Sequence, residues 1–296
     1  MFSICIPTYN TNCTRLLQIL EEQLTITSKE IEVIVLDDGS SSSIANTNKN
    51  ECQRLGFNYI QNKINTGRIQ TRMRLANESS HSWLLFLDAD MIPVRSDFIQ
   101  TYYNNIIEAN YDVYVGGHCY EKKRTPFCLR LNYGNSRENI DEKKRNNNPY
   151  NLIFFGNVLI KKELFLSVFS TYSDPSYGED IYLSAKLKDQ KSRVLHLNNK
   201  TYHLGVETNA VFISKTAEAA ATIATLFKDN KIDQTQSKLL KCYWFLQQNN
   251  LAYIVCIGLA VLKPVLKKCL LWFGKPLVFI DLYRLYYFLK SMKHGS

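Results

Sequence analysis

Two aspartates two residues apart follow a strongly apolar run. Asp88 and Asp90 come directly after residues 83–87, Trp-Leu-Leu-Phe-Leu. In an extended chain, residues i and i+2 point to the same side, so both carboxylates can face one point in space. Mg²⁺ and Mn²⁺ take oxygen ligands of this kind and share their remaining positions with phosphate oxygens. The spacing therefore indicates a metal-diphosphate site, and the alternative is an acidic turn after a strand.

Polar residues also follow two earlier apolar runs. Residues 7–10 (Pro-Thr-Tyr-Asn) end the first run, and Asp37-Asp38 end the run 31–36. Such runs alternate with amphipathic stretches of helical spacing, which predicts an α/β fold with a mainly parallel, twisted, Rossmann-like sheet and helices on both faces. Ligands of these sheets bind beyond the carboxyl ends of the strands. We therefore expect the three acidic or polar clusters to share one site.

The composition excludes a disordered or fibrous protein. The 296 residues are 45% hydrophobic and 12% aromatic, enough for one large domain or a domain with an appendage. The eight cysteines have no metal-ligand spacing, and no signal peptide precedes the first apolar run. A reducing, cytosolic setting with cysteines as small apolar residues is the simplest interpretation.

The segment 137–148 is charged and rich in asparagine, with little to bury. This composition predicts a mobile loop, either a lid over the site or a solvated insertion without a role.

The motifs together resemble the nucleotide-sugar-dependent glycosyltransferases of the GT-A fold, most closely the inverting glycosyltransferase family 2. The resemblance covers about residues 1–205. The matching motifs are PTYN at 7–10, LDDGS at 36–40, Asn65-x-Gly67 with Arg72, LDAD at 87–90, FGN at 155–157, GED at 178–180, and His203.

The resemblance implies a binding site for a UDP-sugar. Thr8 and Asp38 would contact the uracil and ribose, and Arg72 would lie near the diphosphate. Alternatives are that one of Asp37 and Asp38 is only a helix cap and that Arg72 is a solvated helix charge. Gly156 and Asn157 would shape the donor-sugar pocket. The full implied set is Pro7, Thr8, Tyr9, Asp38, Asn65, Gly67, Arg72, Asp88, Ala89, Gly156 and Asn157.

The same resemblance implies a metal site and a catalytic base. Asp90 would ligate Mn²⁺ or Mg²⁺, and Asp88 would be shared between metal and ribose. His203 would complete the site, and the alternative is that it is a structural histidine. Inversion requires one in-line attack, hence one base for the incoming hydroxyl. Asp180 matches that base and Glu179 is the competing choice, while a helix-terminal acid is the structural alternative for one of them.

The C-terminal part is basic and aromatic. Residues 263–296 contain seven Lys or Arg against one acid, a net +6 of the chain's +9. The interleaved Leu, Val, Phe, Trp and Tyr favour a membrane surface over nucleic acid. The apolar run 251–262 has 12 residues and is expected to end at Lys263-Pro264, whereas a membrane span needs about 20. We expect a catalytic domain over 1–210 and a helical region over 211–296, with 251–296 as an interfacial anchor. The alternative is a helical subdomain packed on the core or on another copy.

The expected protein is a metal-dependent, inverting glycosyltransferase that moves one sugar from a UDP-sugar to a hydroxyl of a saccharide or lipid-linked acceptor, in surface polysaccharide or glycan biosynthesis. It would work as a peripheral protein on the cytosolic membrane face, without nucleic acid and with oligomerisation possible. The absence of a Q-x-x-R-W motif and of a set of spanning helices favours a non-processive enzyme. Alternatives are a sugar nucleotidyltransferase, which would carry a Gly-rich basic loop after the first strand, and a catalytically silent nucleotide- or membrane-binding module.

Overall fold

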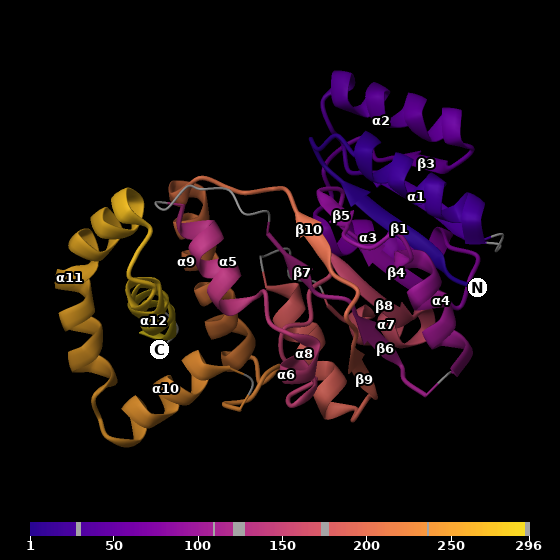
Figure 1. Cartoon of the computed structure of the whole chain (residues 1–296). Coiled ribbons are helices and arrows are strands. Elements are labelled where there is room, and N and C mark those ends of the chain that lie inside the picture. Colours follow the sequence, from indigo (N-terminus) through magenta and orange to yellow (C-terminus); the bar gives the residue numbers. More distant parts are fainter. Residues whose placement is uncertain (28–30, 109, 121–127, 173–177, 236, 294–296) are drawn as a thin grey trace. The chain divides into compact units, whose positions relative to one another are not determined.

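The computed structural model describes residues 1–27, 31–108, 110–120, 128–172, 178–235 and 237–293. The chain forms two compact units, which are described one at a time (Figure 1). The first comprises Met1–Glu121, Glu138–Pro175 and Gln190–Gly205, and the second comprises Lys122–Arg137, Ser176–Asp189 and Val206–Ser296. The domain boundary expected after residue 210 stays a prediction.

A seven-stranded sheet forms the centre of the first unit, in the order β3-β2-β1-β4-β8-β6-β9. β1 pairs in parallel with β2 and with β4, β2 pairs in parallel with β3, and β6 pairs in parallel with β9. In contrast, β8 is antiparallel to its two neighbours, β4 and β6. The predicted mainly parallel α/β fold is therefore confirmed. The strands are β1 (Ser3–Thr8), β2 (Glu32–Asp37), β3 (Asn58–Gln61), β4 (Trp83–Leu87), β6 (Val113–Val115), β8 (Asn157–Lys161) and β9 (Val194–His196).

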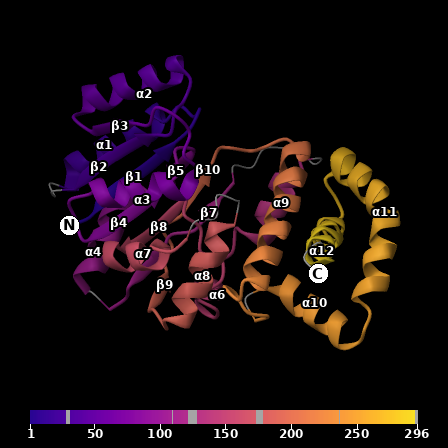
Figure 2. The ribbon, with the colours of Figure 1, turned by 180° about the vertical axis from the view of Figure 1, so that it is seen from behind.

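Helices pack on this sheet because successive strand residues point to opposite faces. Ile4 of β1 belongs to a core cluster with Leu16 of α1, whereas the Cys5 thiol lies 3.3 Å from the Ser79 hydroxyl that follows α3. Figures 1 and 2 show helices around the sheet in both views. The helices around this sheet are α1 (Thr14–Thr27), α2 (Ser42–Leu55), α3 (Arg68–Glu78), α4 (Phe98–Glu108) and α7 (Lys162–Phe169).

A second, three-stranded sheet brings distant parts of the first unit together. It consists of β5 (Met91–Pro93), β10 (Thr201–His203) and β7 (His118–Cys119), with β10 in the middle. β10 is antiparallel to β5 and pairs His203 with Met91, and it is parallel to β7. This register places His203 beside the residue that follows Asp90.

The mobile loop predicted over 137–148 is wrong. The segment contains a short helix, α6 (Glu142–Asn146), and its Arg145 is buried. The Arg145 guanidinium donates to the backbone carbonyls of Gly116 at 3.1 Å and Leu197 at 2.8 Å. A buried guanidinium with several carbonyl partners holds a polar segment in place without an apolar core. Composition does not reveal which of several charges is buried in this way.

The second unit is helical. Its helices are α5 (Leu129–Arg137), α8 (Glu179–Asp189), α9 (Asn209–Lys228), α10 (Lys238–Gln248), α11 (Ala252–Phe273) and α12 (Val278–Lys293). Within this unit α12 lies between α9 and α11, as both views show (Figures 1 and 2). One apolar cluster joins α5, α9, α11 and α12 through Leu129, Ile213, Leu270, Ile280 and Tyr283.

The helix α11 extends beyond Lys263-Pro264, where the apolar run 251–262 ends. α11 continues through Pro264 to Phe273 and ends at Gly274, which has a left-handed φ of 60°. A proline inside a helix costs roughly 3 kcal/mol. Burial of Leu266 and Leu270 beyond the proline offsets that cost, since each apolar side chain contributes about 1.5–3 kcal/mol.

Among the described residues, α9 has the length and apolar composition that would suffice to cross a membrane. Its buried residues include Ile213, Ala220, Ile223 and Ala224, which pack inside the helical unit. Packed core helices meet the same criteria, so this observation carries little weight for a membrane span.

Candidate active site

The turns after β1 and β2 are tied to each other. The Asp38 amide donates to the Thr8 carbonyl at 2.8 Å, and the Asn10 amide donates to the Ser40 hydroxyl at 2.7 Å. Thr8 is buried and the Tyr9 side chain is exposed. The sequence therefore correctly placed these two clusters together at the carboxyl ends of neighbouring strands. Asn10 and Ser40, which make the link, had no predicted role.

Asp38 holds the loop that carries Asn65 and Gly67, two other predicted donor-binding residues. Its buried carboxylate accepts a hydrogen bond from the side-chain NH₂ group of Asn62 at 2.6 Å. It also accepts from the backbone N–H and the hydroxyl of Thr66, at 2.9 and 2.8 Å, and from the backbone N–H of Gly67 at 2.9 Å. Asn65 joins the same loop by accepting from Gly67 at 3.1 Å. A uracil contact for Asp38 stays a prediction.

Neither aspartate of the 37–38 pair caps a helix. The N-cap of α2 is Ser41, and Asp37 accepts from the Ser40 amide at 2.7 Å inside the preceding turn. The alternative of a capping role is therefore wrong for this pair.

Arg72 extends from α3 toward Asp88, the first aspartate of the 88–90 motif. Its guanidinium donates to the Asp88 carboxylate at 2.8 Å and lies 4.6 Å from the centre of the Phe155 ring. Arg72 is buried, so the alternative of a solvated helix charge is wrong. The contact places a positive charge beside a carboxylate that is still partly open to solvent. Ala89, between the two aspartates, is buried.

Gly156 permits close packing against this carboxylate. A Cβ atom at position 156 would lie 3.1 Å from Asp88 Oδ2 and 2.7 Å from Met91 Cε. The absence of a side chain at Gly156 thus lets the start of β8 pack against Asp88, and its role in the donor-sugar pocket stays a prediction.

The side chain of Asn157 forms its hydrogen bonds inside the core. Its side-chain oxygen accepts from the Tyr102 hydroxyl at 2.6 Å, and its NH₂ group donates to the Gly117 and Asn199 carbonyls, both at 2.8 Å. The side chain is buried. The expectation that this amide lines a donor pocket is replaced by a supporting role, because both of its N–H donors are used by backbone carbonyls.

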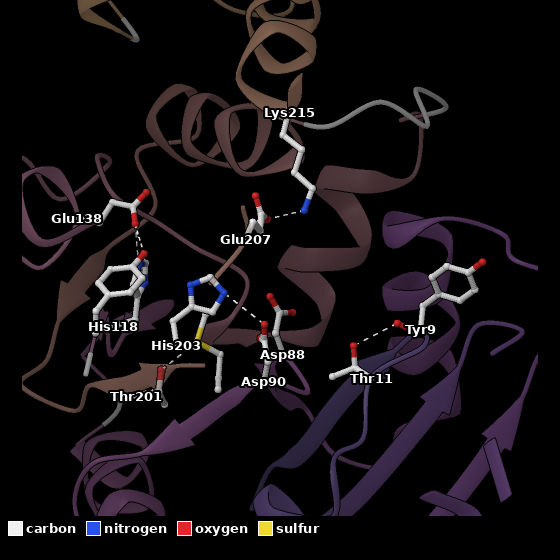
Figure 3. Close-up of polar contacts among 12 residues, drawn as sticks. Tyr9, Thr11, Asp88, Asp90, His118, Glu138, Thr201, His203, Glu207 and Lys215 are labelled. Atoms are coloured by element: carbon white, nitrogen blue, oxygen red, sulfur yellow. Dashed lines mark hydrogen bonds and ion pairs between the residues drawn. The ribbon is translucent and has the colours of Figure 1, made fainter. Parts of the chain in front are cut away.

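Asp90 and His203 lie close together at the end of the small sheet where β5 and β10 pair. His203 Nε2 lies 3.3 Å from Asp90 Oδ2, and the Leu204 amide donates to the Asp90 carbonyl at 3.0 Å (Figure 3). The other ring nitrogen of His203 is buried without a hydrogen-bond partner in the described part of the chain. Gly205 lies so close that a Cβ there would be 1.9 Å from Asp90 Oδ2. Sequence reasoning missed Gly205, since its approach depends on the β5–β10 pairing.

The residues present fit a divalent cation. Figure 3 shows the Asp88 and Asp90 carboxylates together with the His203 ring, a set of two oxygen donors and one imidazole. Such donors suit Mn²⁺ or Mg²⁺, which keep further positions for phosphate or water. In the described ranges no group of three or more His, Cys, Asp or Glu side chains is arranged to hold a metal ion. A metal held by Asp88, Asp90 and His203 therefore stays a prediction, which rests on the chemistry of the three donors.

Three polar side chains behind His203 were not predicted. His118 Nε2 lies 3.1 Å from the Glu138 carboxylate, to which the Tyr120 hydroxyl donates (Figure 3). The His118 and Tyr120 rings lie 5.9 and 5.6 Å from the His203 ring, centre to centre. No sequence spacing marks this cluster, because the pairing of β7 with β10 assembles it.

The predicted acidic pair lies in the second unit. Glu179 and Asp180 occupy the first turn of α8, where the helix dipole favours carboxylates. Glu179 is buried and accepts from the Gly178 amide at 3.1 Å. Asp180 as the base, with Glu179 as its competitor, stays a prediction.

One surface hollow lies away from the predicted site residues. This hollow is lined by Asp112, Lys161 and Arg193 at the opposite, amino edge of the parallel strands. Asp112 lies 2.7 Å from Lys161 and 3.3 Å from Arg193. Burial raises the pKa of Asp112, but hydrogen bonds from Arg193 and Lys161 outweigh burial and lower this pKa to about 2. These charges are satisfied within the protein.

The fold and site define a GT-A type α/β protein, with polar and acidic residues where the strands of a mainly parallel sheet end. Residues 3–169 match glycosyl transferase family 2. The chain therefore belongs to this family and contains a glycosyltransferase domain. The glycosyltransferase GlyA of Streptococcus pneumoniae serotype 4 is 26% identical over 214 residues, which are 68% of this chain. The chain spans 30% of the length of that relative.

Solved structures share the fold. The mannosyltransferase PcManGT of Pyrobaculum calidifontis, solved with GDP-Man and Mn²⁺, has a TM-score of 0.59 at 13% identity, over 100% of this chain and 88% of that one. S. aureus TarS 1-349 with UDP-GlcNAc has a TM-score of 0.54 at 18% identity, over 99% and 90%. Glucosyl-3-phosphoglycerate synthase of Mycobacterium tuberculosis, solved with Mn²⁺, UDP and glucosyl-3-phosphoglycerate, has a TM-score of 0.53 at 18% identity, over 78% of this chain and 80% of that one.

Proposed function

We propose that the protein is a metal-dependent, inverting, non-processive glycosyltransferase that transfers one sugar from a UDP-sugar to an acceptor hydroxyl. The observation that carries this proposal is the pairing of Asp90 with His203 at 3.3 Å, beside Asp88 and its partner Arg72. Relatives of the same fold have been solved with UDP or GDP-sugars and with Mn²⁺ or Mg²⁺. These relatives support a nucleotide-sugar donor and a divalent cation here.

The donor end of the reaction rests on residues of the first unit. Asp90, Asp88 and His203 would hold Mn²⁺ or Mg²⁺, and when bound the cation neutralises charge on the departing diphosphate. Arg72 holds the Asp88 carboxylate by its hydrogen bond, so that Asp88 keeps one orientation. Asp38 holds the 62–67 loop beside the end of β2, where the nucleoside would bind.

The acceptor end requires a base. The Asp180 carboxylate would take the proton of the incoming hydroxyl as its oxygen attacks the anomeric carbon in line with the departing UDP. Asp180 lies on the first turn of α8, where the helix dipole favours carboxylates. Glu179 is buried and bonded to its own backbone turn, which supports Asp180 over Glu179.

The acceptor is proposed to be a saccharide or a lipid-linked saccharide in surface polysaccharide or glycan assembly, reached from the cytosolic face of a membrane. The eight cysteines are all free thiols, as is usual for proteins of reducing compartments. The basic, aromatic helices of the second unit support a position at a membrane.

Donor hydrolysis gives the most direct test. The purified chain should release UDP from at least one of a panel of UDP-sugars when Mn²⁺ is added, and a chelator should stop the release. Asp90→Asn should lower the rate by on the order of 100-fold or more, because a charged ligand is replaced by a neutral one. Asp180→Asn should abolish transfer to an acceptor.

Asp97→Asn is the matched control. Asp97 follows β5 in the first unit, and its exposed carboxylate pairs with Arg95 at 2.6 Å, so its loss should leave the rate unchanged. Metal-independent release, or equal rates for Asp90→Asn and Asp97→Asn, would contradict the proposal. Tight UDP binding without turnover on any acceptor would instead indicate a silent nucleotide-binding module.

A further inference from the structure

α11 is a long helix with one buried and one exposed apolar face. Its buried face consists of Cys256, Leu259, Leu266 and Leu270. At about 1.5 Å per residue, its 22 residues extend over roughly 33 Å. Within the second unit α11 flanks α12 on the side away from α9 (Figures 1 and 2).

The exposed face of α11 is apolar where a soluble protein normally has polar residues. Spacings of three, four, four and seven residues place five side chains on one stripe, opposite the buried face. Each is between 48% and 75% exposed. We call these residues the α11 stripe: Ile254, Ile257, Val261, Val265 and Trp272.

The charges around the α11 stripe are positive. α11 carries no Asp or Glu, and Lys267 and Lys268 are exposed on it. From residue 238 to residue 293 the sequence has nine Lys or Arg and one acid, Asp281, which lies 2.9 Å from Arg137. A second copy of the chain would bring the same positive charge to this face. An anionic lipid surface offers both apolar depth and opposite charge.

We propose that the α11 stripe lies in the interface of a bilayer that contains anionic phospholipids, with the helix parallel to the membrane plane. The five apolar side chains enter the headgroup and upper acyl region, while Lys267 and Lys268 meet lipid phosphates. The helix does not span, because its other face is covered by its own unit. This proposal is independent of the donor chemistry, since it concerns only the second unit.

Vesicle sedimentation of the full chain tests the proposal. The protein should sediment with vesicles of phosphatidylcholine mixed with phosphatidylglycerol. The double variant Val261→Glu, Trp272→Glu should lower its partition coefficient by about tenfold or more, because two apolar anchors are lost. The matched control is Ile26→Glu, Ile64→Glu, which changes two comparably exposed isoleucines of the first unit and should bind vesicles like the wild type.

The lipid charge is tested separately. Lys267→Gln, Lys268→Gln should lower the partition coefficient by about tenfold on mixed vesicles and leave binding to pure phosphatidylcholine unchanged. Circular dichroism should show the same helix content in every variant. Absence of wild-type binding to mixed vesicles would overturn the proposal. Unchanged binding by the Val261→Glu, Trp272→Glu variant, with an altered mass in light scattering, would also overturn it and assign the stripe to a second copy.

Discussion

At the scale of single residues, the site depends on backbone that can approach a carboxylate closely. Gly205 lies beside Asp90 Oδ2, at a distance where a Cβ atom would overlap it. The Asp90 carboxylate therefore keeps its orientation toward His203 only while position 205 has no side chain. Gly205 is thus a positioning residue for the proposed metal site.

Gly205→Ala should weaken the response to metal more than it changes nucleotide binding. The added methyl group displaces the Asp90 carboxylate, and we expect the Mn²⁺ concentration that gives half-maximal UDP release to rise about tenfold. UDP affinity measured without metal should stay the same. Gly258→Ala is the matched control, because a Cβ there meets no atom within 4 Å. Equal metal dependence in the two variants would refute the positioning role.

At the scale of elements, α6 is held against β9 by a buried cation and a histidine. Arg145 Nη1 donates to His196 Nδ1 at 2.9 Å, and His196 Nε2 donates to the Pro149 carbonyl at 2.8 Å. Burial lowers the pKa of His196 to about 4; the charge of Arg145 adds to this effect, and the Pro149 contact opposes it. Burial also lowers the pKa of Arg145. The folded protein therefore keeps a neutral imidazole between these two elements.

This arrangement predicts a pH dependence of stability. The unfolded chain takes up a proton on His196 near pH 6.5, whereas the folded protein takes it up near pH 4. The free energy of unfolding should therefore fall as the pH drops through this window, by about 2 kcal/mol between pH 7 and pH 5. Urea unfolding at the two pH values should show a smaller loss for His196→Asn, which keeps an acceptor for Arg145 and does not titrate. An identical loss in both proteins would exclude His196 as the cause.

At the scale of the whole molecule, the C-terminal helices are part of a packed unit. The cluster that contains Leu129 and Ile213 is completed by Leu270, Ile280 and Tyr283 from α11 and α12. Removal of residues 251–296, the truncation that the sequence suggests for releasing an anchor, would expose this cluster. Substitutions on the α11 stripe are therefore the better probe of membrane binding.

Deletion of residues 251–296 should destabilise the second unit. Its remaining helices lose the side chains that cover α9, so proteases should cleave within 206–250 at concentrations that leave the full chain intact. Limited proteolysis with mass spectrometry measures this directly. A truncated chain as resistant as the full one would show that α11 and α12 pack only loosely.

The sequence by itself determined the α/β class, the family and the clustering of residues 7–10, 37–38 and 88–90 at strand ends, because apolar periodicity and local motifs depend on neighbouring residues. Only the tertiary structure decided that Arg145 is buried in a polar segment, that α11 continues through Pro264, and that Gly205, His118 and Glu138 surround Asp90 and His203. Each of these rests on contacts between residues far apart in the chain. Their free energy comes from burial and pairing that no local pattern records.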